Sequence, residues 1–73
     1  MPVIHANVEE VFTYHAPDEV QIQQLMRVRT SAKELARVIL DCVPSSADQQ
    51  ASLRLLREAV MTANAAIALR GLV

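Results

Sequence analysis

The sequence predicts an all-α protein in which a short N-terminal arm or helix precedes a long two-helix hairpin. Hydrophobic residues make up 52% of the 73 residues, but aromatic residues make up only 3% and Gly71 is the one glycine. The aromatic, β-branched and glycine-rich mixture that is typical of sheets is therefore missing. In addition, two segments carry apolar residues at helical spacing, and a proline stands before each of them. We expect a chain of this length to form a single small domain over residues 1–73.

Residues 1–16 form the predicted N-terminal arm, which lacks a sustained apolar period. Asn7 is followed three residues later by Glu10, a spacing typical of the capping box at the start of a helix. One interpretation is therefore a short helical turn through Val11 and Phe12. The alternative is an extended arm.

The first long helix is predicted over residues 17–43. Pro17 suits the first helical position, where its missing N–H costs nothing, and the two acidic residues after it suit the positive end of the helix dipole. Pro44 ends the helix because proline disfavours helical geometry in the residue before it. The side chains expected to face the second helix recur at alternating spacings of three and four. They are Leu25, Val28, Ala32, Leu35, Ile39 and Cys42.

The second long helix is predicted over residues 45–70. Ser46 and Gln49 form a capping-box pattern at its start, and Gly71 suits the left-handed residue that follows a helix end. The side chains expected to face the first helix are Leu53, Leu56, Val60, Ala63 and Ile67. A second stripe on a neighbouring face is rich in small residues and allows another helix to approach closely. It consists of Leu55, Ala59, Thr62, Ala66 and Leu69.

Each predicted helix has apolar residues on more than one face, whereas packing in a hairpin covers only one face of each. Leaving the other faces in water forfeits roughly 25 cal/mol for each Å² of apolar area. Large exposed apolar patches mark surfaces that associate. We therefore expect an obligate homo-oligomeric helical bundle.

The formal net charge is −1, with seven Lys and Arg residues against eight Asp and Glu residues. Proteins that bind duplex DNA or RNA usually carry a basic surplus, so we expect no such partner. The charge is nevertheless uneven along the chain. Glu9 and Glu10 lie in an acidic segment that contains no Lys or Arg before Arg27, and a cationic segment follows it.

Cys42 is the only cysteine, so no internal disulfide can form, and its place in the apolar spacing predicts a small core residue rather than a reactive thiol. Residues 1–7 lack the pattern of a signal peptide, and no run of about 18 apolar residues exists, so we expect no membrane partner. These features favour a cytoplasmic protein.

Enzyme motifs are missing from the sequence. One glycine is too few for a Gly-rich phosphate loop. His5 and His15 lie ten residues apart ahead of the long helices, which excludes the HExxH and zinc-ribbon patterns. We expect His5 to be a solvated terminal residue, and we expect neither catalysis nor a metal or cofactor.

Tyr14, the only tyrosine, stands beside His15 just ahead of the first long helix. Its ring either packs on the hairpin or stacks on a nucleobase. Near the other end of the chain, Arg70 in the last helical turn suits the helix dipole. Asn64 lies among alanines, where it is a candidate for an interface hydrogen bond.

Arg29, Lys33 and Arg37 recur every four residues and so form one cationic row on the first long helix. The row is either a solvated face that pairs with Glu34 or Asp41, or a row that binds phosphates. In the second case an arginine can bind a phosphate bidentately and the lysine acts as a point charge.

The order and spacing of several segments are distinctive. These segments are Phe12–Pro17, Gln23, Arg29 with Ala32–Ala36, Cys42–Ser45, Leu56–Met61 and Ala63–Ala68. Together they resemble the small phage anti-CBASS proteins, which are helical cyclic-nucleotide sponges that blunt bacterial immune signalling. The resemblance implies a homo-oligomer, hexameric in known relatives, that sequesters cyclic dinucleotides such as 3′,3′-cyclic GMP–AMP, and cyclic trinucleotides, without cleaving them. It also implies the cytoplasm of an infected bacterium as the location.

The resemblance also assigns site residues. Tyr14 matches the tyrosine that stacks on a cyclic dinucleotide, which relatives hold between two protomers. The cationic phosphate ligand on the first long helix falls on either Arg29 or Lys33. Ser31 and Arg70 match a separate cyclic trinucleotide pocket.

Two positions depart from the family pattern. Thr62 stands where a tryptophan is common. Leu69 stands where an arginine often follows, and Arg70 comes one residue later. One residue on a helix is a rotation of about 100°, so this displacement bears directly on the trinucleotide pocket.

Two other classes of protein remain as alternatives. A nuclease would cleave the same ligands, but it needs a metal site or an acid–base pair that the sequence does not contain. A structural or interaction oligomer, such as an antitoxin-like scaffold or a phage assembly factor, would need the apolar seams but not Tyr14.

Overall fold

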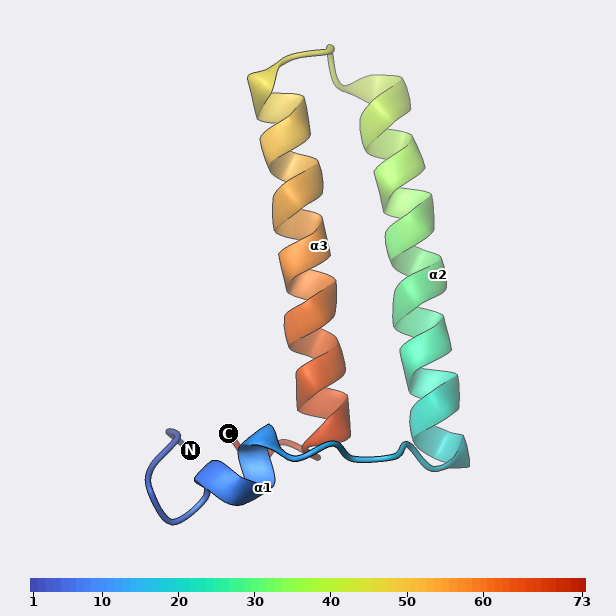
Figure 1. Cartoon of the computed structure of the whole chain (residues 1–73). Helices are drawn as coiled ribbons and strands as arrows, with labels where there is room; N and C mark the ends of the chain where they lie inside the picture. Colours follow the sequence, from blue (N-terminus) through green and yellow to red (C-terminus); the bar gives the residue numbers. More distant parts are fainter.

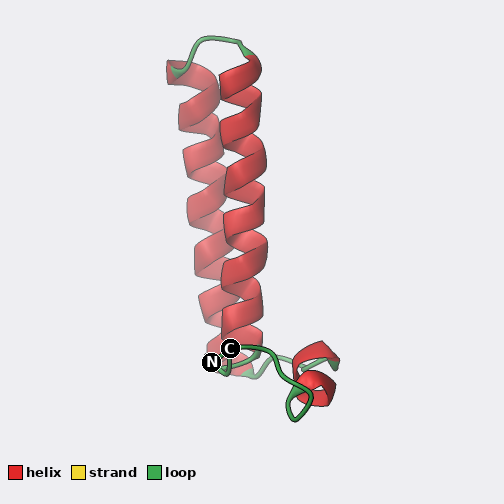
Figure 2. Ribbon diagram, turned by 90° about the vertical axis from the view of Figure 1, so that its left-hand side faces the viewer, coloured by secondary structure: helices red, strands yellow, loops and turns green.

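The computed structural model describes residues 1–73 and contains three helices and no strand (Figure 1, Figure 2). They are α1 (Val8–Phe12), α2 (Glu19–Cys42) and α3 (Ala47–Ala68). Helices α2 and α3 lie side by side as an antiparallel hairpin, whereas α1 packs against neither of them. The N-terminal arm lies at the open end of the hairpin, opposite the interhelical turn, and both termini lie there too (Figure 1). The all-α class and the predicted hairpin are therefore confirmed.

The start of α2 is fixed by a reciprocal capping box. The Asp18 carboxylate accepts a hydrogen bond from the backbone N–H of Gln21 at 2.8 Å, and Gln21 Oε1 accepts one from the backbone N–H of Asp18 at 3.0 Å. These bonds satisfy two backbone donors at the helix start. Asp18 is consequently the N-cap, and Pro17 lies outside the helix. The prediction that Pro17 occupies the first helical position was wrong because Asp18 supplies the stronger start.

The start of α3 has one of the two hydrogen bonds of the predicted capping box. Ser46 Oγ accepts from the backbone N–H of Gln49 at 3.1 Å, as predicted. The Gln49 side chain, however, donates to the Val43 carbonyl oxygen at 3.1 Å rather than returning to Ser46. Gln49 is 4% exposed, so this bond ties α3 firmly to the end of α2 across the turn.

The end of α3 also differs from the prediction. The backbone N–H of Gly71 donates to the Ala66 carbonyl and that of Arg70 to the Ile67 carbonyl, at 3.1 and 3.2 Å. This is the Schellman pattern, in which the residue after the C-cap is left-handed. That residue is Arg70, with φ of 53°, and Gly71 follows it with φ of 75°. Arg70 therefore lies beyond the helix, not in its last turn, and it takes the position predicted for Gly71.

The N-terminal arm contains the short helix that was one of its two predicted forms, so the extended alternative was wrong. Asn7 is the N-cap of α1, but its side chain does not cap the helix. Asn7 Oδ1 instead accepts from the N–H of Ile4 at 2.8 Å, and its amide donates to the Pro2 carbonyl at 3.1 Å. Asn7 thus holds the first residues of the arm in a closed turn.

The seam between α2 and α3 follows the predicted apolar pattern only in part. All the predicted seam residues of α3 are half-buried. On α2, Leu35 is 48% exposed and Cys42 is exposed, and Ala36 lies at the seam instead of Leu35. A straight α-helix drifts about 20° per heptad from an ideal 3.5-residue repeat, and this drift rotates both side chains out of the seam. The prediction of Cys42 as a core residue was therefore wrong.

No hydrophobic residue is fully buried in the single chain. The three buried residues are Asn7, Gln21 and Gln49. Large hydrophobic side chains instead lie exposed along the arm and on the outer faces of both long helices. None of the three helices has the length and hydrophobicity that a membrane span needs. The unpaired apolar faces on which we based the expected homo-oligomer are therefore present, and the oligomer itself stays a prediction.

Asn64 is half-buried on α3, and its Oδ1 atom is buried without a hydrogen-bond partner in the chain. Buried polar atoms nearly always have a partner. The interface hydrogen bond expected of Asn64 stays a prediction, in which the missing donor belongs to another copy of the chain.

Candidate functional site

Two grooves run along the hairpin, one on each face. They share Ala32, Leu56 and Val60, which lie at the seam. Arg29 lines one groove and Ser31 the other, since two residues on a helix differ by about 200° in direction. Each groove therefore presents a different set of polar side chains around an apolar floor.

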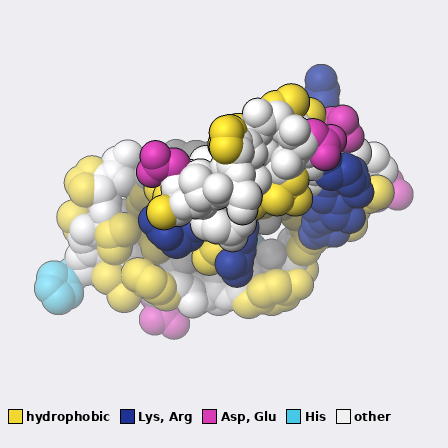
Figure 3. All heavy atoms as spheres, turned by 90° about the horizontal axis from the view of Figure 1, so that it is seen from above, with side chains coloured by type: hydrophobic (Ala, Val, Ile, Leu, Met, Phe, Trp, Pro, Cys, Tyr) yellow, Lys and Arg dark blue, Asp and Glu magenta, His cyan; other side chains and the backbone are white.

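The cationic groove has a volume of about 580 Å³ and carries three basic side chains, two from α2 and one from α3. Besides the shared seam residues, it is lined by Arg29, Lys33, Ala36, Leu40, Leu53, Arg57 and Met61. Neither Arg29 nor Lys33 forms a salt bridge, so both charges are free to bind an anion. Viewed from above, Lys and Arg side chains lie at several places on the surface, some of them beside exposed hydrophobic ones (Figure 3). A ligand that combines negative charge with flat apolar rings matches this groove.

The cationic row predicted on α2 divides into two parts. Arg37 lies 3.8 Å from Glu34 in an exposed pair and lines neither groove. Arg37 therefore fits the solvated interpretation, in which a surface ion pair contributes little. Arg29 and Lys33 line the cationic groove, and Lys33 also lines a cavity along α2 together with Arg37. Phosphate binding by this row stays a prediction.

Tyr14 lies in the loop between α1 and α2, and it is 82% exposed. Its ring does not pack on the hairpin in the single chain, so the packing interpretation was wrong there. Tyr14 also lines neither groove, and a single chain does not bring it together with Arg29 and Lys33. The ring is free to stack on a planar group.

Ser31 and Arg70 lie on the same side of the hairpin. Ser31 lines the second groove, about 540 Å³ in volume, which we call the serine groove. Arg70 lines a smaller cavity of about 380 Å³ at the open end of the hairpin, together with Asp18 and Gln21. Gln24 lines both the serine groove and this open-end cavity, so it connects the two predicted residues. The structure thus places Ser31 and Arg70 apart from Arg29, whereas Ser31 and Lys33 also line one further cavity along α2.

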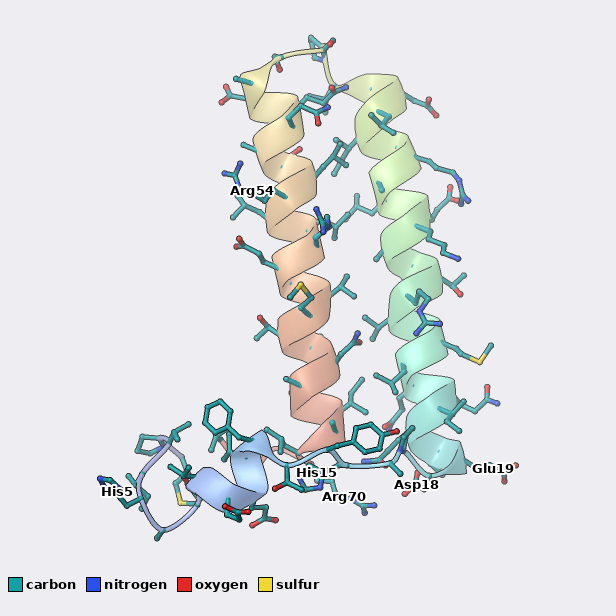
Figure 4. All side chains as sticks on the ribbon, viewed as in Figure 1. His5, His15, Asp18, Glu19, Arg54 and Arg70 are labelled. Atoms are coloured by element: carbon teal, nitrogen blue, oxygen red, sulfur yellow. The ribbon has the colours of Figure 1, made fainter.

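Arg70 is already paired in the single chain. Its Nη2 atom lies 3.1 Å from Asp18 Oδ2, and both side chains point toward each other at the base of the hairpin (Figure 4). The pair is exposed to solvent, with 73% of the Arg70 side chain accessible. The remaining guanidinium donors are thus open to a ligand.

Sequence reasoning missed Arg57 in the cationic groove, and Arg27 and Gln24 in the serine groove. Arg57 was predictable, because the hairpin turns at Pro44 and Ser45. Lys33 lies 11 residues before Pro44 and Arg57 lies 12 residues after Ser45, so the two residues are neighbours across the hairpin. Gln24 carried no comparable signal, because a single exposed glutamine on a helix is common.

The fold is a small helical hairpin with two grooves around a shared apolar floor, one lined by Arg29, Lys33 and Arg57 and the other by Arg27 and Ser31. The chain matches the family model described as Acb2/Tad1, hairpin domain, over residues 5–68. This match covers most of the chain, and the protein therefore belongs to the Acb2/Tad1 hairpin family of anti-CBASS sponges. Comparisons with curated proteins and with solved structures find no match. The family confirms the resemblance found in the sequence and is consistent with sequestration of cyclic nucleotides.

Proposed function

We propose that this protein sequesters cyclic oligonucleotide second messengers without cleaving them and thereby inhibits CBASS immunity. The observation that carries the proposal is the cationic groove, where Arg29, Lys33 and Arg57 surround an apolar floor. Cyclic oligonucleotides combine phosphodiester charges with planar bases, which are the two features that this groove accepts. The proposed setting is the cytoplasm of an infected bacterium, with neither duplex nucleic acid nor membrane as a partner.

The proposed cyclic dinucleotide site contains Arg29, Lys33 and Tyr14. Arg29 binds a phosphate through paired N–H donors, and Lys33 contributes a second positive charge. Because Tyr14 lines neither groove of its own chain, we place it at the cationic groove of a second copy. A two-fold interface presents each residue twice, so one tyrosine per chain supplies two stacking rings for the two bases. This arrangement also accounts for a homo-oligomer, for which we propose a hexamer.

The proposed cyclic trinucleotide site contains Ser31 and Arg70. Leu69 is the C-cap of α3 and is half-buried, while Arg70 reaches the open-end cavity despite its displacement by one residue. On a helix, displacement of the arginine by one residue is a rotation of about 100°. That rotation does not apply at Arg70, because its backbone is left-handed and the chain changes direction there. The guanidinium is thus available on the same side as Ser31.

The test is calorimetry with 3′,3′-cyclic GMP–AMP. We expect Tyr14→Ala and the double variant Arg29→Ala with Lys33→Ala each to lose affinity, the double variant by about a hundredfold or more, since charge-assisted hydrogen bonds contribute most. Arg37→Ala is the matched control, because it removes the same charge from the same helix outside the cationic groove; Arg37 lines only a cavity along α2 that it shares with Lys33. Unchanged affinity in both test variants would refute the site. Recovery of linear product from the denatured complex would indicate a nuclease.

The exposed apolar faces support one rival function, a structural or interaction oligomer without a nucleotide ligand. A thermal-shift panel of cyclic dinucleotides and trinucleotides separates the two proposals. A binder is stabilised by its ligand in a concentration-dependent way, whereas a scaffold is not.

A further inference from the structure

Arg70 occupies a backbone position at which glycine is favoured. Its φ of 53° places it in the left-handed region directly after the C-cap of α3. A side chain with a Cβ is disfavoured in this conformation relative to glycine. A cost of this kind is a reason to ask what the side chain does. The Arg70 side chain is directed to Asp18, the N-cap of α2.

The partner of Arg70 is held in place by its own helix. Asp18 Oδ1 accepts from the backbone N–H of Gln21 at 2.8 Å, while Asp18 Oδ2 accepts from Arg70 Nη2 at 3.1 Å. The carboxylate is therefore fixed at the N-cap and offers only its second oxygen. Arg70 forms this single contact, and most of its side chain is accessible to solvent. Asp18 and Arg70 both line the open-end cavity, together with the exposed amide of Gln24.

We propose that Asp18 is a built-in counter-ion that lowers the affinity of Arg70 for anionic ligands and so sets the binding strength of the open-end cavity. This inference rests on the proposed role of Arg70 in binding phosphate groups. A phosphate that binds the free edge of the guanidinium lies within several ångströms of the Asp18 carboxylate, and the two negative charges repel. A ligand must either share Arg70 with Asp18 or displace it. Asp18 thereby keeps Arg70 from binding abundant small anions in the absence of a ligand with additional contacts.

Asp18→Asn removes the negative charge and keeps the helix cap, since asparagine caps helices as well as aspartate does. The probe is inorganic phosphate, followed through the side-chain Nε–Hε resonance of Arg70 in the full-length protein. We expect Asp18→Asn to bind phosphate at Arg70 about threefold more tightly at low salt, and the difference to shrink as salt screens the carboxylate. A cyclic trinucleotide measured by calorimetry should gain affinity in the same direction.

Two variants serve as controls. Glu19→Gln removes a neighbouring carboxylate that forms no contact with Arg70, and we expect phosphate affinity to stay unchanged. Arg70→Gly removes the guanidinium while relaxing the left-handed backbone, so we expect loss of cyclic trinucleotide binding with no loss of thermal stability. A purely structural role of the ion pair predicts instead that stability falls and that Asp18→Asn leaves phosphate affinity unchanged.

Equal or weaker phosphate affinity in Asp18→Asn overturns the inference. Asp18→Ser, which also retains an N-cap, gives a second measurement if the asparagine variant loses helix content. If the wild-type protein binds no cyclic oligonucleotide, the proposed function fails. The phosphate titration at Arg70 still decides whether Asp18 competes for the guanidinium.

Discussion

Gln21 joins the two helices at the open end of the hairpin, and its replacement by alanine is expected to destabilise the fold. The side chain is 7% exposed. Its Nε2 donates to the Ile67 carbonyl at 3.0 Å, and its Oε1 accepts from the backbone N–H of Asp18 at 3.0 Å. Gln21→Ala removes both bonds and leaves the Ile67 carbonyl without its side-chain donor.

The magnitude follows from these two bonds. Each contributes about 1 kcal/mol net to the free energy of unfolding, and the Ile67 carbonyl keeps the backbone N–H of Arg70 as a donor. Alanine returns a few tenths of a kcal/mol through its higher helix propensity. The expected loss for Gln21→Ala is therefore about 2 kcal/mol, which lowers the melting temperature of a domain this small by about 10 °C.

The assay is thermal and urea unfolding of Gln21→Ala beside Gln23→Ala at one matched protein concentration, because association makes apparent stability depend on concentration. Gln23 is exposed, lies on the same helix and forms no hydrogen bond, so its replacement should change stability by less than about 0.5 kcal/mol. Gln21→Glu separates the two bonds, since a carboxylate can accept from Asp18 but cannot donate to Ile67. Equal stability of Gln21→Ala and Gln23→Ala would refute the role of Gln21 as a tie between the helices.

Two further predictions concern the cationic groove and the cysteine. Arg57→Ala should weaken binding of 3′,3′-cyclic GMP–AMP by about tenfold in calorimetry, because it removes one charge-assisted contact from the groove; affinity equal to that of Arg37→Ala would place Arg57 outside the site. Cys42 should react quantitatively with a thiol reagent in the folded single chain, and Cys42→Ser should leave its stability within about 0.5 kcal/mol, since the side chain is exposed. Protection of Cys42 that persists in a dissociated monomer would contradict the exposed position.

The sequence predicted the elements of the fold because their signals are local. Pro44 ends α2, and Ser46 begins α3 through its own hydroxyl. Local signals failed where two of them competed. Pro17 and Asp18 both favour a helix start, and the capping box that Asp18 forms with Gln21 decided between them. The end of α3 is a second case. The backbone hydrogen bonds there determine which residue is left-handed, and that residue is Arg70 although glycine comes next in the sequence.

The candidate site was less predictable than the fold. Periodicity correctly placed Arg29 and Lys33 on one face, because residues four apart on a helix are neighbours. It could not separate them from Arg37, since that distinction depends on where the second helix lies. The pairing of Arg70 with Asp18 joins residues 52 positions apart, and no spacing rule within one helix reaches that far.

The buried residues of this chain are three amides, and this fact determines how its stability responds to temperature. Gln49 closes the turn, Gln21 closes the open end and Asn7 closes the arm, so directional bonds set the shape of the single chain. The heat capacity of unfolding grows with the apolar surface that becomes exposed. A chain that buries no hydrophobic residue completely therefore unfolds with a small heat-capacity change. In an assembly that covered the outer faces, most of the heat-capacity change would come from separating the chains. Cooling would then weaken the contacts between chains before it weakened the hairpin itself.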